Sequence, residues 1–148
     1  MRERDHSLGA KLRCGGASDD LFPTPARVAS FIHGCHRLGL PFKATAGLHH
    51  PFRHVDTTTG FVQHGFVNLV GAAVLSVAHD LDADVLEDIV ADQDSASFSL
   101  TPDGFSWREL RANEGAIREA RSDLFTAYGS CSFAEPVEDL TALGILPR

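Results

Sequence analysis

Two similar stretches decide the predicted fold: Ala10-Lys11-Leu12-Arg13-Cys14-Gly15-Gly16 and Pro41-Phe42-Lys43-Ala44-Thr45-Ala46-Gly47. In each, polar and apolar residues alternate, as in a β-strand with one buried face, and glycine ends the run. A helical pattern lies between them, and a strand–helix–strand crossover is almost always right-handed. This order is typical of adjacent units of a β/α barrel, where charged groups at the strand ends carry the chemistry.

The helix between the two strands has recognisable ends. Thr24 can cap it, Pro25 lies in its first turn and Gly39 follows its last residue. Further along, the patterns predict a strand over 41–48, a polar loop over 49–60, an apolar helix over 61–79, a helix capped by Asp82, a hairpin over 97–107, a charged helix over 108–122, a strand over 125–133 and a last helix from Glu135 to Gly144.

These elements predict one α/β domain over residues 10–148, with residues 1–9 as a flexible lead-in. The parallel strands are too few for a closed eight-stranded barrel. Open sheet edges are usually paired or covered, and a helix that is apolar on most sides needs partner surfaces. We therefore expect a partial (half) β/α barrel, with parallel strands and flanking helices, completed by oligomerisation. We expect this oligomer to be a homodimer or a higher assembly. The alternative is that the chain is one piece of something longer.

Composition limits the classes of function. The chain has 148 residues and a net charge of −7, which argues against nucleic acid and anionic lipid as partners. Cys14, Cys35 and Cys131 are widely spaced, as is typical of reduced thiols in a cytoplasmic protein. No run is apolar enough to span a membrane, and phosphate-loop and dinucleotide fingerprints are absent from the sequence. We expect a small-molecule substrate, with an anionic one compatible with the local basic residues, and no cofactor.

The strand lysines are the first candidates for catalysis. Lys43 and Thr45 share one strand face, and Lys11 and Arg13 share a face of the other strand. Burial and neighbouring cations favour a neutral lysine, which can attack a carbonyl to form a Schiff base. Lys43 is then the nucleophile, and Lys11 and Arg13 bind anionic oxygens. If both lysines instead face solvent, a non-catalytic role is favoured.

Histidines cluster directly after the second strand. His49 and His50 follow its end, His54 lies in the same loop and His64 is close behind. His49 or His50 could move protons at the strand end. Alternatively, several of these imidazoles could converge on a metal ion with Asp56 or Glu135, although the spacing matches no standard zinc signature. We assign no metal ligands.

Two further groups of polar residues could bind substrate. His64 and Asn68 form a polar pair on an otherwise apolar helix, so they either meet a buried partner or line a cavity. Tyr128 and Ser130 share a face of the third strand and would face the same interior as Lys43 if that strand joins the sheet.

Two resemblances add to this interpretation. Lys43-Ala44-Thr45-Ala46-Gly47 resembles a lysine strand of deoxyribose-phosphate aldolases, and Lys11-Leu12-Arg13-Cys14-Gly15-Gly16 is similar to that family's second lysine strand, in the opposite order. This likeness implies a Schiff base on Lys43 with Lys11 as helper. The same segments, together with His64-Gly65-Phe66-Val67-Asn68-Leu69 and the stretch 129–140, resemble the C-terminal half of an uncharacterised bacterial protein family. That likeness implies a shortened or half-barrel member and no known activity.

The sequence thus predicts a small-molecule enzyme of lyase or isomerase type, which acts on a carbonyl or enolisable substrate through the lysine pair. One alternative is a metal-dependent enzyme that uses the histidines between His49 and His64. The other is a non-catalytic binding module or partner subunit that docks on another chain.

Overall fold

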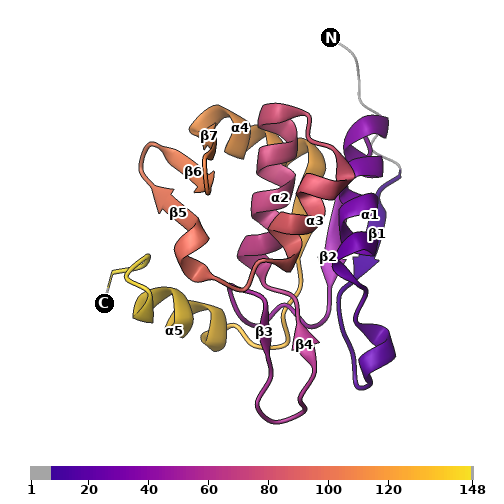
Figure 1. Ribbon diagram of the computed structural model, residues 1–148, viewed down its shortest axis with the longest axis vertical. Helices are drawn as coiled ribbons and strands as arrows, with labels where there is room; N and C mark the ends of the chain where they lie inside the picture. The colour runs from indigo at the N-terminus through magenta and orange to yellow at the C-terminus, as the bar shows by residue number, and fades with distance from the viewer. Residues whose placement is uncertain (1–7, 148) are drawn as a thin grey trace.

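Three parallel strands form the sheet that the lysine stretches predict. In the computed structural model, which describes residues 8–147, β1 (Ala10–Arg13), β2 (Phe42–Thr45) and β8 (Phe125–Tyr128) lie in the order β1-β2-β8. Figure 1 shows β1 and β2 next to each other. Lys11 is the register partner of Lys43, and Arg13 is the partner of Thr45. The mixed α/β class and the parallel sheet are confirmed.

Helix α1 (Pro25–Leu38) connects β1 to β2 and has the ends that the sequence predicts. The Thr24 hydroxyl accepts a hydrogen bond from the Arg27 N–H at 3.3 Å. Gly39 adopts a left-handed conformation with φ of 62°, and its N–H donates to the last carbonyls of the helix. A side chain is strained in that conformation, so glycine ends the helix here.

The remaining elements surround this unit. They are β3 (His54–Val55), β4 (Val62–Gln63), α2 (Phe66–His79), α3 (Ala83–Ala91), β5 (Phe98–Thr101), β6 (Gly104–Trp107), β7 (Leu110–Asn113), α4 (Glu114–Glu119) and α5 (Ala134–Ala142), with 3₁₀ turns at Asp19–Leu21 and Ser95–Ser97 and a π-helical turn at Ala120–Leu124. No helix among residues 8–147 has the length and apolar character needed to cross a bilayer.

The apolar helix begins later than predicted. Residues 61–65 are not helical: Val62 and Gln63 form β4, which pairs with β3 in an antiparallel hairpin. Gly65 precedes the helix and packs against the backbone of Phe52, where an added Cβ would lie 2.4 Å from Phe52 atoms. This close approach fixes where α2 starts, and local periodicity does not reveal it.

The charged segment 108–122 is likewise not one helix. The predicted hairpin is present as β5 and β6, but β7 adds a third antiparallel strand before α4 begins. Ala112 is buried opposite Phe105, so tertiary pairing holds this stretch in a strand. The Asn113 side chain then accepts from the Ala116 N–H and caps α4.

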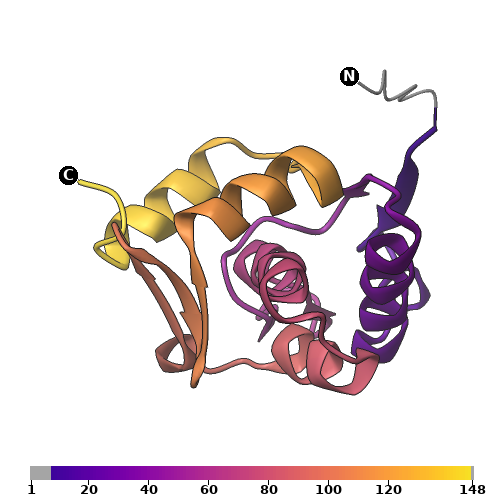
Figure 2. The same ribbon diagram turned by 90° about the horizontal axis from the view of Figure 1, so that it is seen from above.

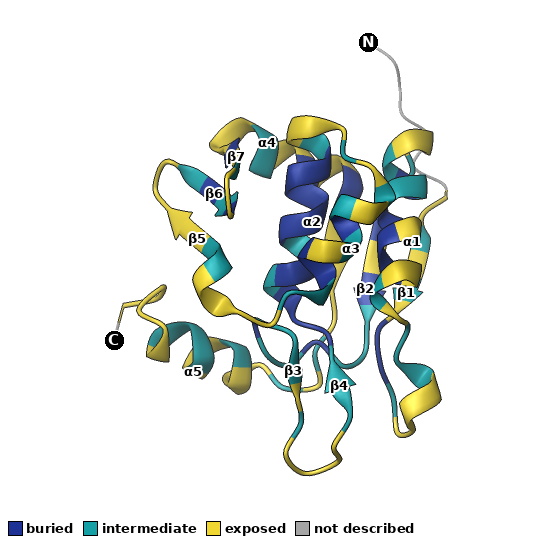
Figure 3. Cartoon of the chain, in the orientation of Figure 1, coloured by how far each residue is buried: buried dark blue, intermediate teal, exposed yellow. Residues whose placement is uncertain are grey.

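Helix α2 lies at the centre of the molecule. Seen from above in Figure 2, it is enclosed by α1 and α3 on one side and by the β5–β7 sheet and α4 on the other. It is almost wholly buried, as Figure 3 shows, and contributes residues such as Leu69 and Leu75 to the core. The helix-facing side of the parallel sheet adds Phe42 and Ala44, and the Phe42 ring stacks on Phe125 with centroids 4.7 Å apart.

None of residues 8–147 covers the opposite face of the parallel sheet. Lys11, Arg13, Lys43 and Ala127 on this face are all exposed, and β1 and β8 are both edge strands within the described chain. Residues 1–7 of the predicted lead-in 1–9 lie outside the described residues.

Candidate functional site

Two histidines after β2 meet two carboxylates of α5. The His50 Nδ1–H donates to the Asp139 Oδ2 at 2.6 Å, and His49 Nδ1 lies 3.4 Å from Glu135 Oε2. Glu135 and Asp139 are four residues apart, so both carboxylates lie on the same face of α5. The end of β2, whose loop carries both histidines, is thereby joined to the last helix of the chain.

The His50–Asp139 pair lines a hollow of about 480 Å³ between the loop after β2 and α5. Its walls combine apolar and polar side chains, among them Phe52, Val55, Leu143, His54 and Asp56. Both members of the pair are roughly one-third exposed, with side-chain values of 37% and 35%. The pair is therefore accessible to a small molecule that enters the hollow.

His54 is the second imidazole of this hollow. Its ring lies edge-on to the His50 ring, with centroids 4.7 Å apart, and its Nδ1–H donates to the Phe52 carbonyl at 3.0 Å. Asp56 lies close to it: hydrogen bonds from Thr59 lower the pKa of Asp56, and the positive charge of His54 lowers it further. The hollow thus holds two imidazoles, each with a carboxylate as neighbour.

His49 has a different arrangement from His50. Its Nδ1 lies 3.1 Å from the Ser130 hydroxyl as well as 3.4 Å from Glu135. A serine nucleophile relay requires the serine and the carboxylate on opposite ring nitrogens. Because both partners share one nitrogen, they do not form such a relay. His49 instead holds its loop against Ser130 and, through Glu135, against α5.

The strand lysines lie apart from the histidines. Lys11 and Lys43 line a second hollow of about 460 Å³, together with Leu8, Pro41 and Ser122 near the start of the strands. Both lysines are exposed, so the chain itself does not supply the burial that a Schiff-base lysine needs. Their exposure favours the non-catalytic interpretation of this face.

The remaining residues of the lysine face do not build a closed site. Arg13 Nε–H donates to the Gly15 carbonyl at 2.9 Å, and Thr45 is half-buried next to it in register.

His64 and Asn68 are internal structural residues, so their expected contact with substrate has no support here. Both are fully buried. His64 Nε2–H donates to the Pro23 carbonyl at 2.6 Å, and its Nδ1 accepts from Arg53 at 3.0 Å. Burial is the main cause that lowers the pKa of His64 to about 4; the hydrogen bond to Pro23 opposes the shift and the Arg53 charge adds to it.

Asn68 links three separate segments of backbone. Its oxygen accepts from the Arg53 N–H at 2.9 Å, and its amide group donates to the carbonyls of Ile89 and Asp92. Every polar group of the side chain is engaged with the fold, which leaves none for a ligand.

Tyr128 lies on the opposite side of the sheet from the one expected. A register shift between β2 and β8 aligns Ala127 with Lys43 and Tyr128 with Ala44. The Tyr128 ring therefore faces the helices and stacks on Phe66, with centroids 5.3 Å apart, and partial burial raises its pKa.

The histidines do not assemble a metal centre. Within residues 8–147, no group of three or more His, Cys, Asp or Glu side chains is arranged to hold a metal ion. His50 and His49 contact carboxylates of α5, while the buried His64 is hydrogen-bonded to Arg53. The geometry thus gives no support to the metal-dependent alternative.

Sequence reasoning missed the partner that matters most at this site. Asp139 is not among the site residues that the sequence predicts, yet it contacts His50 across 89 residues of sequence. The available signal was the spacing of four residues between Glu135 and Asp139, which places both carboxylates on one face of the helix. That these carboxylates meet His49 and His50 is visible only once the helix is docked. His54 was considered solely as a metal ligand.

Comparison with protein-family models, curated proteins and solved structures finds no significant match to this chain. The resemblances to deoxyribose-phosphate aldolases and to an uncharacterised bacterial family therefore stay predictions from short motifs.

Proposed function

We propose that the protein is a small-molecule enzyme of lyase or isomerase type, which moves protons on a carbonyl or enolisable substrate in the hollow beside α5. The observation that supports this is the 2.6 Å hydrogen bond between His50 Nδ1 and Asp139 Oδ2. A carboxylate on Nδ1 fixes the imidazole tautomer and stabilises the imidazolium that forms when Nε2 takes a proton. No residue from 8 to 147 is hydrogen-bonded to the His50 Nε2, so that atom is available as a base.

In the proposed step, His50 Nε2 removes a proton from the carbon next to a carbonyl. The electron pair of the broken C–H bond forms the new C=C bond, and the carbonyl oxygen takes a proton from His54. His54 lines the same hollow as His50, and the Asp56 carboxylate lies beside it. Where the first carbon carries a hydroxyl group, the enediol gives that hydroxyl proton back to His54 while His50 returns the other proton to the former carbonyl carbon, which yields the isomer. Where the next carbon carries a leaving group, the enol O–H proton returns to His54, the C=O bond re-forms and the leaving group departs with its electron pair, which makes the reaction a lyase reaction.

The test is exchange of carbon-bound hydrogen for deuterium in D₂O, followed by proton NMR with dihydroxyacetone and pyruvate as probes. We expect the protein to accelerate exchange and His50→Gln to slow it by about 100-fold or more, the range for loss of a general base. Asp139→Asn should slow it as well, because the amide no longer favours the required tautomer.

A matched control comes from another histidine–aspartate pair. His36 Nε2 lies 3.2 Å from Asp80 Oδ1 on the surface, outside the hollow. His36→Gln should leave the exchange rate unchanged. Exchange that is equally fast in the His50 and His36 variants, or absent from the unmodified protein with both probes, would contradict the proposal.

A second candidate function rests on the uncovered lysine face. We infer that another copy of the chain covers this face and completes the half barrel. Sheets made only of parallel strands are almost always covered on both faces, and here the exposed face carries Lys11, Arg13 and Lys43. Cover would remove Lys43 from water, the condition under which it could form a Schiff base.

Light scattering and borohydride trapping distinguish the outcomes. A dimer that Lys43→Glu dissociates, and a stable adduct with pyruvate on Lys43 in that dimer, would support both the cover and the Schiff base. A dimer without an adduct would support a binding surface alone. A monomer at all concentrations, with no adduct, would refute the role of the lysine face in self-association.

A further inference from the structure

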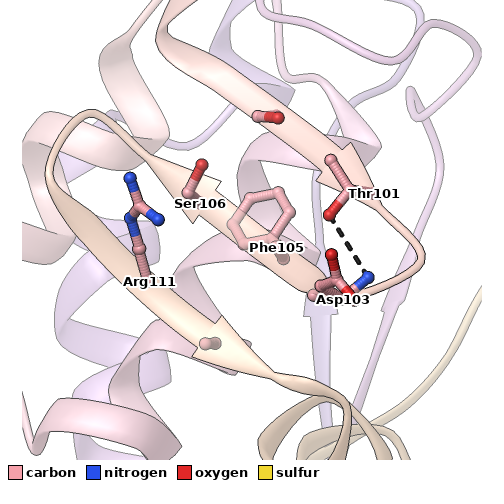
Figure 4. Close-up of a pocket in the computed structure, with 8 residues that line it drawn as sticks. Thr101, Asp103, Phe105, Ser106 and Arg111 are labelled. Carbon is pink, nitrogen blue, oxygen red and sulfur yellow. Dashed lines mark hydrogen bonds between the residues drawn. The ribbon is translucent and has the colours of Figure 1, made fainter.

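The β5–β6–β7 sheet carries a hollow that is lined by both polar and apolar residues and is separate from the proposed catalytic site. Its volume is about 200 Å³. Figure 4 shows Arg111, Ser106 and Thr101 extending from three adjacent strands over the same surface, with Asp103 in the turn at one end. Phe105 and Trp107 of the middle strand are buried, and Phe105 also contributes to the lining of the hollow.

One cross-strand row supplies the hydrogen-bond donors. Ser99 is the register partner of Ser106, and Ser106 is the partner of Arg111. Residues directly opposite on neighbouring antiparallel strands have Cβ atoms only about 5 Å apart. Two hydroxyls and a guanidinium therefore lie side by side. No residue between 8 and 147 makes a hydrogen bond or ion pair with the Arg111 guanidinium.

The space beside this row is fixed by the backbone. Gly104 lies next to the row with φ of 151°, and a Cβ there would lie 2.1 Å from the Ala112 carbonyl oxygen. A side chain at that position would collide with the β7 backbone, so glycine is required beside the hollow.

We propose that this hollow binds the oxoanion group, carboxylate or phosphate, of a small molecule. The Arg111 guanidinium offers paired N–H donors that match two oxygens of such a group, and the hydroxyls of Ser99 and Ser106 can donate to the same oxygens. Asp103 limits the ligand: its carboxylate repels a second negative charge, so the far end of the ligand must be neutral or positive.

The test is a titration of the ¹⁵N-labelled chain with inorganic phosphate and, separately, with acetate, followed by two-dimensional NMR. We expect saturable shifts confined to Ser99, Ser106 and Arg111, including the Arg111 Nε–H signal. Arg111→Gln should weaken binding at least tenfold. A response to phosphate alone or to acetate alone would identify which oxoanion the hollow takes.

The matched control is Arg108→Gln. Arg108 lies next to the same sheet, but its guanidinium is already bound to Asp92 and lies over the Trp107 ring. Its replacement should leave anion binding unchanged, whereas Asp103→Asn should tighten it by removing a like charge. Shifts that do not saturate, equal binding by the Arg111 and Arg108 variants, or no tightening in Asp103→Asn would overturn the proposal.

Discussion

The buried His64 should make the stability of this fold depend on pH. The imidazole is fully buried, with Nε2–H bound to Pro23 and Nδ1 accepting from Arg53. Protonation would place a hydrogen on Nδ1 toward the Arg53 guanidinium, which is the charged group facing it. The folded chain therefore keeps His64 neutral, with a pKa of about 4 against an ordinary value of 6.5.

The sign and size of the effect follow from this difference. Because the folded pKa is lowered, the unfolded chain binds the proton more readily, so the stabilisation is fully present above pH 6.5 and is lost as the pH falls toward 4. A tenfold change in an equilibrium constant is about 1.4 kcal/mol. The free energy of unfolding should thus fall by about 2 kcal/mol at pH 5 and by about 3 kcal/mol below pH 4.

Urea unfolding at pH 7 and pH 5 measures the loss. His64→Gln is the comparison, since glutamine can still donate to the Pro23 carbonyl but does not titrate in this range. We expect the variant to be less stable at pH 7 and to lose about 2 kcal/mol less than the unmodified protein between the two pH values. An equal loss in both proteins would refute the assignment of the pH dependence to His64.

Other predictions test the buried network, the backbone and the thiols. Asn68→Ala should lower the free energy of unfolding by about 3 kcal/mol, because it leaves a backbone N–H and two carbonyls without their partner. Gly104→Ala should lower the free energy of unfolding by more than about 2 kcal/mol through overpacking. Gly34→Ala, in open space on α1, should raise the free energy of unfolding by about 0.5–1 kcal/mol, and urea unfolding of both variants tests the contrast. An aromatic disulfide reagent should label the exposed Cys131 quickly and Cys14 only on unfolding, because burial raises the Cys14 pKa to about 12; equal labelling rates would contradict this.

The sequence was sufficient for the unit β1–α1–β2 because its signals are local. Thr24 and Gly39 directly flank the helix and mark its two ends. The alternation of polar and apolar residues around Lys43 predicts a strand without knowledge of the neighbouring strands. The β3–β4 hairpin and β7 could not be predicted in this way. These strands are short and depend on contacts with distant residues. The end of β4 leads into Gly65, which packs on the Phe52 backbone, and β7 pairs with β6 beside the buried Phe105.

The position of Tyr128 shows how one extra residue changes a predicted site. Alternation counted from the sequence assumes an unbroken ladder, but Phe42 aligns with Phe125 and Lys43 with Ala127, so Thr126 is left over. The Thr126 hydroxyl donates to the Phe42 carbonyl at 3.2 Å, which holds the shift in place. Beyond it every side chain of β8 faces the other way, and the lysine face loses the tyrosine that was expected there.

The candidate catalytic pair depends on the docking of α5, which no local signal predicts. None of the α5 residues is buried, and the helix is held to the β2 loop through His49–Glu135 and His50–Asp139. The same contacts thus position the helix and orient the proposed base. Loss of Asp139 should for this reason lower catalysis and loosen α5, while loss of Glu135, which leaves the His50–Asp139 hydrogen bond in place, should loosen α5 with a smaller effect on catalysis. For Asp139→Asn and Glu135→Gln, backbone amide hydrogen exchange in α5 reports the attachment of the helix, and exchange of the carbon-bound hydrogen of the substrate reports catalysis. Equal losses of activity in both variants would mean that Asp139 acts only by holding the helix.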